Sequence, residues 1–526
     1  MAEGYLCLVL HAHLPFVRHP EHDDFLEEDW LFEAITETYV PLIDTFLRLR
    51  ADGVPFRLAM SVTAPLVAML DDPLLRGRYA RHLGRLIDLA ESEVRGNPDF
   101  TAIGRAARHY RHRFQATRAF RDRWGGDLLA PLRELQAQGF IDILACTATH
   151  GFLPLMRGEA PRRAQVRAGA MAYARTFGRR PRGIWLAECG FDHGVDELLA
   201  EEGLEYFLLD SHGIEHGRPA PTRGIAAPVR TPAGPAAFCR DRETGRQVWS
   251  AHEGYPGDPV YREFYRDLGW DADYDYIRPY LHDDGVRRGV GIKYHRVTGQ
   301  VPLHEKDVYD PEAAAERARE HGRNFVFNRK HQVRHLRAHM DRPPVVVAPY
   351  DAELFGHWWY EGPRFIEEVL RGAAADPDLE TITPAEYLAR HGDIQRQRPN
   401  PSTWGVAGDN RVWLNSENAW LYRHQHWAEQ EMSSLVGRWS GSGGLAERAL
   451  RQAGRELLLM QSSDWAFILT AGTTTPYAAR RVKEHLAGFE KLRRGLQAGD
   501  LVEPDVSALE ARTPLFHDLD VSAWRA

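Results

Sequence analysis

The chain has 526 residues, of which 43% are hydrophobic and 27% charged, and its formal net charge is -8. This composition is that of an ordinary globular protein, the length suits a barrel with an added domain, and the negative charge argues against a nucleic-acid partner. No window reaches the length of a membrane span, no positive region precedes the first apolar run, and the four cysteines follow no disulfide or zinc spacing. We therefore expect no membrane partner, no signal peptide and a cytoplasmic location.

Apolar runs of strand character recur along most of the chain. They start near Gly4, Pro55, Phe140, Trp185, Glu205, Gly289, Ala348 and Leu379. Between them lie helical segments, such as the one that Asp310 and Pro311 begin and the segment from Leu132 to Gln138 that Gly139 ends. Strands that alternate with helices predict a parallel sheet covered on both faces. Seven or eight such strands favour a complete or nearly complete α/β barrel over an open doubly wound sheet.

Two segments interrupt this pattern, and a third ends it. Residues 76–133 are longer than one strand-to-helix connection needs, and their helical spacing predicts a helical insertion. Residues 229–257 carry Pro, Gly and charge without periodicity, which predicts a long lid loop over the barrel mouth. The polar stretch 390–410 marks a boundary. We therefore expect a catalytic domain over 1–400 and a C-terminal helical domain over 401–526, with amphipathic helices around 417–438, 445–469 and 476–497.

Two of the apolar runs end in a carboxylate. Glu188 follows the run at Trp185, and Asp351 follows the run at Ala348. The carboxyl ends of parallel barrel strands meet at one rim, and a pair of carboxylates there is what acid/base and nucleophilic work on sugars requires. The alternative is that each carboxylate caps the helix that follows its strand.

Three histidines also stand at strand ends. His11 and His13 alternate on the first run, so both side chains face the same side, and His150 ends the run at Phe140. This pattern has two interpretations. Neutral histidines can hydrogen-bond sugar hydroxyls, or, with an aspartate, they can hold a zinc ion as in metal-dependent sugar deacetylases. We favour the first, because Glu188 and Asp351 explain the chemistry without a metal.

Tryptophans in loops indicate the substrate class. Those outside periodic core segments are Trp270, Trp358, Trp359, Trp404 and Trp413. Exposed aromatic rings stack on the apolar faces of pyranose rings, so a row of them holds a glucan chain. The alternative is that some of these rings seal the interface between the two domains.

The ordered motifs of the chain resemble those of glycoside hydrolase family 57, and specifically its α-1,4-glucan branching enzymes. The matching segments are HAHLPF from His11, ATHGFLPL from Ala148, WLAECGF from Trp185, APYDAELFGHWWYEGP from Ala348 and QSSDWAF from Gln461. The resemblance implies an incomplete (β/α)7 barrel with a C-terminal helical domain, a retaining double displacement and no metal or other cofactor. It also implies residue roles. Glu188 is then the nucleophile and Asp351 the acid/base, the donor subsite is lined by His11, His13, His150 and Asp464, and Arg262 and Trp270 contact the substrate.

The resemblance predicts a 1,4-α-glucan branching enzyme whose partner is an α-glucan polysaccharide. Such a transferase must exclude water and hold an acceptor chain, which the lid loop around Phe238 and the segment with Trp404 and Trp413 are expected to do. Branching members usually carry a tyrosine near the tip of that loop, whereas this chain has Phe238. The alternatives are an α-amylase or 4-α-glucanotransferase of the same family, a glucan-binding protein without activity and a metal-dependent deacetylase-like enzyme.

Overall fold

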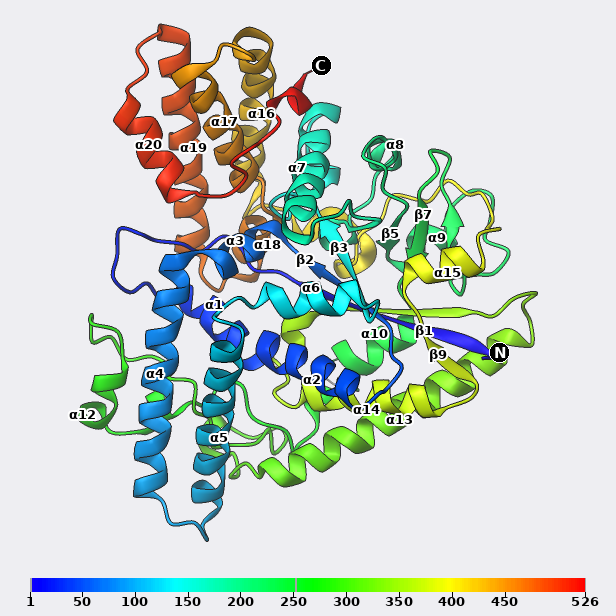
Figure 1. The fold of residues 1–526 in the computed structure, drawn as a ribbon, viewed down its shortest axis with the longest axis vertical. Helices are drawn as coiled ribbons and strands as arrows, with labels where there is room; N and C mark the ends of the chain where they lie inside the picture. Colours follow the sequence, from blue (N-terminus) through cyan, green and yellow to red (C-terminus); the bar gives the residue numbers. More distant parts are fainter. Residues whose placement is uncertain (1, 251–252, 526) are drawn as a thin grey trace.

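A computed structural model describes residues 2–250 and 253–525 of the chain. Its centre is a ring of seven parallel strands in the order β1-β2-β3-β4-β5-β7-β8 (Figure 1). β8 pairs with β1, but β7 and β8 meet only where Arg240 bridges Val347 and the Asp241 N–H donates to the Val347 carbonyl at 2.8 Å. The ring is thus weakly closed at one seam, and the expectation of an incomplete (β/α)7 barrel with a helical domain is confirmed.

The barrel strands are short and buried. Their bounds are β1 (Gly4–Ala12), β2 (Leu58–Val62), β3 (Ile141–Cys146), β4 (Gly183–Trp185), β5 (Tyr206–Leu209), β7 (Ala236–Cys239) and β8 (Val345–Asp351). Outside the ring, β6 (Val229–Arg230) runs antiparallel to β7, and β9 (Leu379–Thr381) pairs with the start of β1. Because β1 lies between β2 and β8, His11 stands beside Ser61 on one side and Asp351 on the other.

Two predictions about the strands are wrong. The run from Gly289 is not a strand, because the Val290 and Gly291 N–H groups donate to the Asp267 carboxylate instead of to a neighbouring strand. The seventh barrel strand is β7, within the segment predicted as a lid. Its apolar residues are buried between β5 and β8, and the Pro and Gly residues just before it form only the turn from β6. Residues 251–252 of the predicted lid lie outside the described residues.

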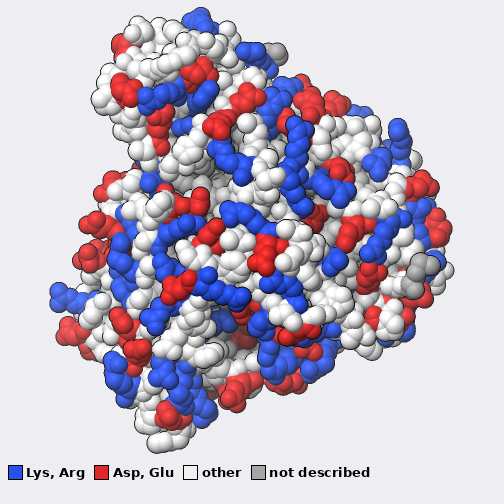
Figure 2. Space-filling model, viewed as in Figure 1, with Lys and Arg blue, Asp and Glu red and all other residues white. Residues whose placement is uncertain are grey.

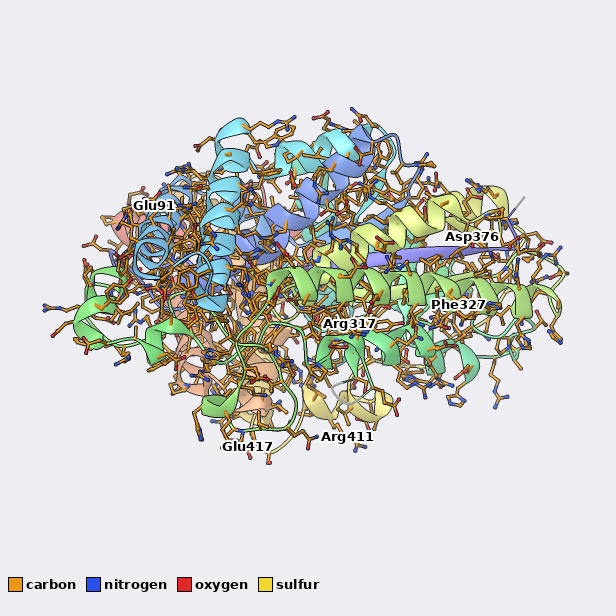
Figure 3. All side chains as sticks on the ribbon, turned by 90° about the horizontal axis from the view of Figure 1, so that it is seen from below. Glu91, Arg317, Phe327, Asp376, Arg411 and Glu417 are labelled. Atoms are coloured by element: carbon orange, nitrogen blue, oxygen red, sulfur yellow. The ribbon has the colours of Figure 1, made fainter. Side chains whose placement is uncertain are left out.

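Helices cover the barrel on its outside. Those that follow barrel strands or lie in the connections are α1 (Glu28–Ala34), α2 (Val40–Ala51), α3 (Ala64–Asp71), α7 (Glu159–Phe177), α8 (Val195–Glu201), α9 (Ser211–Glu215), α10 (Arg242–Trp249), α11 (Leu268–Asp271), α12 (Tyr274–Ile277), α13 (Pro311–Arg337), α14 (Gly362–Ala375) and α15 (Pro384–Arg390). Asp310 caps α13 as predicted, since its carboxylate accepts the N–H groups of Glu312 and Ala313. Viewed from below, α13 crosses the molecule with Arg317 and Phe327 on it (Figure 3).

The predicted helical insertion is a hairpin of α4 (Pro73–Gly96) and α5 (Ala102–Arg123), followed by α6 (Leu129–Ala137). The Asp72 side chain caps α4 by accepting the Leu75 N–H. α4 and α5 pack on each other, and the hairpin extends from the body of the molecule below α1 and α3 (Figure 1).

The C-terminal helices form a bundle that stands beside α7 (Figure 1). They are α16 (Ala419–Trp439), α17 (Gly444–Met460), α18 (Ser463–Ala471), α19 (Thr475–Ala498) and α20 (Glu503–Arg512). The segment predicted as one helix over 445–469 is two helices, α17 and α18, which separate at Gln461 and Ser462. This break points the start of α18 at the barrel, where Ser462 bridges Gly151 and the Ser463 N–H donates to the His150 carbonyl at 3.0 Å.

The outer surface offers no large area of one charge in the view of Figure 2, where acidic and basic side chains are interspersed. Among the described residues, none of the helices is long and apolar enough to cross a membrane.

Candidate active site

Glu188 and Asp351 lie at the rim formed by the carboxyl ends of the strands. Asp351 is the last residue of β8, in register with His11 of β1. Glu188 lies in a 3-10 turn, η3 (Ala187–Cys189), just beyond the end of β4, with φ 61 and ψ 23. Cys189 and His150 also have positive φ values, 49 and 59. Three non-glycine residues in the left-handed region mark a strained rim, as at many functional sites.

Two groups from outside the barrel hold the Glu188 carboxylate. The Trp404 indole N–H donates to Oε2 at 2.8 Å, and the Ser463 hydroxyl donates to Oε1 at 2.9 Å. Trp404 lies on the segment between the barrel and α16, which also carries Arg411 and Glu417 at the lower edge of Figure 3. Glu188 therefore depends on residues more than 200 positions later in the chain.

The two carboxyl groups occupy different surroundings. Burial raises the pKa of Glu188, but the hydrogen bonds from Trp404 and Ser463 oppose that rise. Burial also raises the pKa of Asp351 well above its usual range, and the nearby charges of Glu353 and Glu188 raise it further. Two hydrogen bonds thus favour the charged form of Glu188, while neighbouring carboxylates favour the protonated form of Asp351, and surroundings that differ in this way separate a nucleophile from an acid.

Glu353 supports this rim from two residues beyond Asp351. Its carboxylate accepts the His13 backbone N–H at 3.1 Å and the hydroxyl of Tyr39. Burial raises the pKa of Glu353 to about 6, against the opposing hydrogen bond from Tyr39. Tyr39 ends a short π-helix, η1 (Ile35–Tyr39), and π-helices are often found at functional sites. This π-helix directs the side chains of Glu37, Thr38 and Tyr39 at the loop between β8 and α14.

The three histidines lie together at the rim of the barrel. His11 Nε2 and His150 Nε2 are 2.9 Å apart, and the rings of His13 and His150 stack at 3.9 Å between centroids. Burial lowers the pKa of His11 and of His150 well below the usual value, so both are neutral. His13 differs, because Asp464 lies 2.9 Å from its Nε2 and raises its pKa in spite of burial. Burial would raise the pKa of Asp464, but His13 outweighs it and brings that pKa to about 2.

The metal-binding interpretation of these histidines also has a geometric basis. His13, His150 and Asp464 each offer one ligand atom, and these atoms lie within 4.8 Å of one another. However, His13 and Asp464 already bond to each other, and His150 Nε2 already faces His11. A metal would have to replace these contacts, so a sugar subsite lined by these side chains without a metal remains our preferred interpretation.

Three residues predicted to touch substrate or to cover the site are buried elsewhere. Phe238 is fully buried in β7, edge-to-face with Tyr206, so the prediction that it lies on a lid is wrong. Arg262 is 4% exposed and forms an ion pair with Glu37 at 2.5 Å, because its charge must be neutralised inside the fold. Trp413 is 1% exposed and stacks on Phe152 at 4.6 Å, so it packs the domain interface instead of presenting a platform to a glucan.

The other tryptophans divide in the same way. Trp270 and Trp358 are 55% and 53% exposed, whereas Trp359 is buried. Trp404 is half-buried, with its ring edge-to-face on Trp185 at 5.0 Å.

Three residues that contact the site were not predicted from the sequence, namely Ser463, Glu353 and Tyr39. Ser463 and Glu353 lie within the same sequence motifs as Asp464 and Asp351, and this position was the only indication of a role at the site. The sequence around Tyr39 gave no such indication.

Comparison with known proteins places this chain in a family. The model for glycosyl hydrolase family 57 matches residues 7–335, and the model for the C-terminal part of 1,4-alpha-glucan branching enzymes matches residues 424–524. A 1,4-alpha-glucan branching enzyme of Thermococcus kodakarensis is 36% identical over 97% of this chain and 76% of its own length. A probable 1,4-alpha-glucan branching enzyme of Mycobacterium tuberculosis is 30% identical over 94% of this chain and 93% of its own.

Solved structures of similar proteins match nearly the whole fold. The alpha-amylase AmyC of Thermotoga maritima has a TM-score of 0.93 at 40% identity, over 99% of both chains. The branching enzyme of Thermococcus kodakaraensis, solved in complex with glucose, has a TM-score of 0.90 at 33% identity, over 100% of this chain and 97% of that one.

Proposed function

Because the chain belongs to glycosyl hydrolase family 57, we propose that it is a 1,4-α-glucan branching enzyme, with Glu188 as nucleophile and Asp351 as general acid/base. The observation that carries this proposal is the contrast between the two carboxyl groups. Glu188 receives two hydrogen bonds that favour its charge, while Asp351 is buried beside other carboxylates that favour its proton. The match of the C-terminal region to branching enzymes supports transfer as the outcome.

In the first step, Glu188 attacks the anomeric carbon of an α-1,4-linked glucose unit while Asp351 gives its proton to the leaving oxygen. The products are a glycosyl ester on Glu188 and a shortened chain with a free 4-hydroxyl group. The Asp464 carboxylate would accept from a hydroxyl of the sugar that becomes attached, and His11, His13 and His150 would line the subsite of that sugar. In the second step, Asp351, now ionised, takes the proton of an acceptor 6-hydroxyl, whose oxygen displaces Glu188 and forms an α-1,6 branch.

Hydrolysis by the same site is the second candidate, because an alpha-amylase is among the structures most similar to this chain. Water would then take the place of the 6-hydroxyl in the second step. Transfer requires an acceptor platform, and the exposed rings of Trp270 and Trp358 and the half-buried ring of Trp404 are the groups suited to it. We propose an α-glucan as the substrate and the cytosol as the compartment.

The deciding experiment is incubation of the protein with amylose, followed by debranching of the product and analysis of chain lengths. New α-1,6 linkages support the branching proposal. Shortened linear chains without branches would replace it with hydrolysis or α-1,4 transfer. The Glu188→Gln variant is the control, and an unchanged polymer with both proteins would contradict every enzymatic proposal.

A further inference from the structure

Ser463, the first residue of α18, connects the C-terminal domain with the barrel through a hydrogen bond to the Glu188 carboxylate. Its hydroxyl lies 2.9 Å from Glu188 Oε1 and 2.8 Å from His150 Nδ1, and the residue is 3% exposed. Resting on the proposed function, we propose that Ser463 is a positioning residue that keeps the Glu188 carboxylate ionised and aimed at the anomeric carbon, and that a chain of hydrogen bonds from Ser61 fixes the direction of its hydroxyl.

The chain of contacts is continuous and buried. Ser61 Oγ is 3.0 Å from His11 Nδ1, His11 Nε2 is 2.9 Å from His150 Nε2, and His150 Nδ1 is 2.8 Å from Ser463 Oγ. Ser61, His11 and His150 are all 4% exposed or less. Water is therefore a poor competitor for these hydrogen bonds, and each link restricts the next.

The direction of every bond follows from the carboxylate at the end. An ionised carboxylate only accepts, so the Ser463 hydroxyl donates to Glu188 and must accept from His150 Nδ1–H. A neutral imidazole has a single N–H, so His150 Nε2 accepts from His11 Nε2–H. His11 Nδ1 then accepts from the Ser61 hydroxyl. Because this arrangement aims the Ser463 proton at Glu188, a proton on Glu188 would have no place in it, and the carboxylate is kept charged.

Backbone contacts hold the same hydroxyl in place. The Ser463 N–H donates to the His150 carbonyl at 3.0 Å, and the Trp404 N–H donates to the Glu188 carbonyl at 3.0 Å. Both His150 and Glu188 have left-handed backbones, at φ 59 and 61. The segments beyond the barrel thus restrain two strained barrel residues and supply both donors to Glu188.

Other titratable groups also face Glu188 and must be considered in a pH experiment. From the described structure these are Asp351 on β8, Asp464 on α18, His13 just after β1 and His150 after β3. The buried thiols of Cys146 and Cys189 also lie nearby, and burial raises the pKa of both, so they stay neutral. None of these groups is removed by a change at Ser463.

The test compares the pH dependence of kcat/KM for cleavage of a maltooligosaccharide, which reports α-1,4 bond breaking whatever the acceptor. Removing one hydrogen bond to a charged group changes an equilibrium by about tenfold or more, so in Ser463→Ala the acid limb should move upward by about one pH unit. Ser463→Thr, which keeps the hydroxyl, should restore the limb. Ser61→Ala, which touches neither Glu188 nor Ser463, should move it in the same direction by a smaller amount.

The matched control is Thr470→Val, which removes another hydroxyl from α18. Thr470 donates to the Val412 carbonyl at 2.6 Å and has no contact with Glu188, so its pH profile should match the wild type. A wild-type profile in Ser463→Ala would overturn the proposal. If Ser463→Ala does not fold, Ser61→Ala decides, with a shifted acid limb in support and an unshifted one against. A wild-type protein that cleaves no α-1,4 bond would refute the proposed function itself.

Discussion

Trp404 forms two hydrogen bonds with Glu188: its indole N–H donates to the carboxylate Oε2 at 2.8 Å, and its backbone N–H donates to the Glu188 carbonyl at 3.0 Å. A tryptophan from beyond the barrel thereby fixes a residue whose φ is 61. A strained backbone of this kind costs about 1–3 kcal/mol and persists only where its surroundings enforce it. The nucleophile is therefore assembled by the barrel and by the segment that follows it.

We first predict that Glu188→Gln and Asp351→Asn each lower turnover on amylose by several orders of magnitude. Each amide is nearly isosteric, but it can neither attack as a carboxylate nor transfer a proton. The melting temperature should stay close to that of the wild type. Substantial activity in either variant, with an intact fold, would remove that residue from the mechanism.

The pH dependence of the acid/base offers a second prediction. The alkaline limb of kcat/KM reports loss of the Asp351 proton, and the Glu353 charge is one cause of the raised pKa of Asp351. Since the pKa of Glu353 is about 6, its carboxylate is charged above that pH. Glu353→Gln removes the charge, so the pKa of Asp351 falls and the limb moves to lower pH.

The amide oxygen that Glu353→Gln introduces can still accept from the His13 N–H, so the support of β1 is kept. Glu361→Gln is the matched control, because Glu361 is another buried glutamate of the same region but is not among the causes of the Asp351 shift. An alkaline limb that stays in place in Glu353→Gln would show that burial alone sets the proton affinity of Asp351.

The sequence predicted the parts of this structure that depend on local pattern. The apolar runs that end in Glu188, Asp351, His11 or His150 could be recognised from the sequence, because a buried strand followed by a polar residue is a local pattern. The exposure of a single side chain cannot be predicted in this way, because it depends on tertiary packing. Phe238, Arg262 and Trp413 lie in parts of the sequence without clear periodicity, yet tertiary packing buries all three. Ser463 could not be recognised either, since its partners lie 275 and 313 residues away.

The burial of Arg262 gives a third prediction. Arg262→Ala leaves Glu37 buried without its cation, and breaking such a pair costs about 3–5 kcal/mol. Urea unfolding should show this loss of stability, while KM of the folded fraction should change little. A higher KM at unchanged stability would restore the interpretation of Arg262 as a substrate contact.

A fourth prediction concerns metal. If His11, His13 and His150 bind sugar, exhaustive chelation should leave activity intact, and elemental analysis should find less than one zinc per chain. The His13–Asp464 ion pair should then survive in the resting protein, which NMR titration of the His13 ring can follow. Activity that is lost on chelation and restored by zinc would favour the deacetylase-like interpretation.

The last prediction separates acceptor binding from packing among the tryptophans. Trp413 is 1% exposed, so Trp413→Ala should destabilise the fold by about 3–5 kcal/mol instead of changing specificity. Trp404 bonds to Glu188, so its variants alter the nucleophile and cannot isolate an acceptor effect.

Trp270 is the informative position, because it is 55% exposed. If its ring holds an acceptor glucan, Trp270→Ala should lower branching more than hydrolysis, since water needs no aromatic platform. Stacking of one ring contributes about 1 kcal/mol, so the ratio of transfer to hydrolysis should fall several-fold. Phe327→Ala is the matched control, because Phe327 is 59% exposed on α13 and belongs to no part of the proposed site (Figure 3). An unchanged ratio in Trp270→Ala would exclude this ring from the acceptor subsite and make Trp358 the next exposed tryptophan to test.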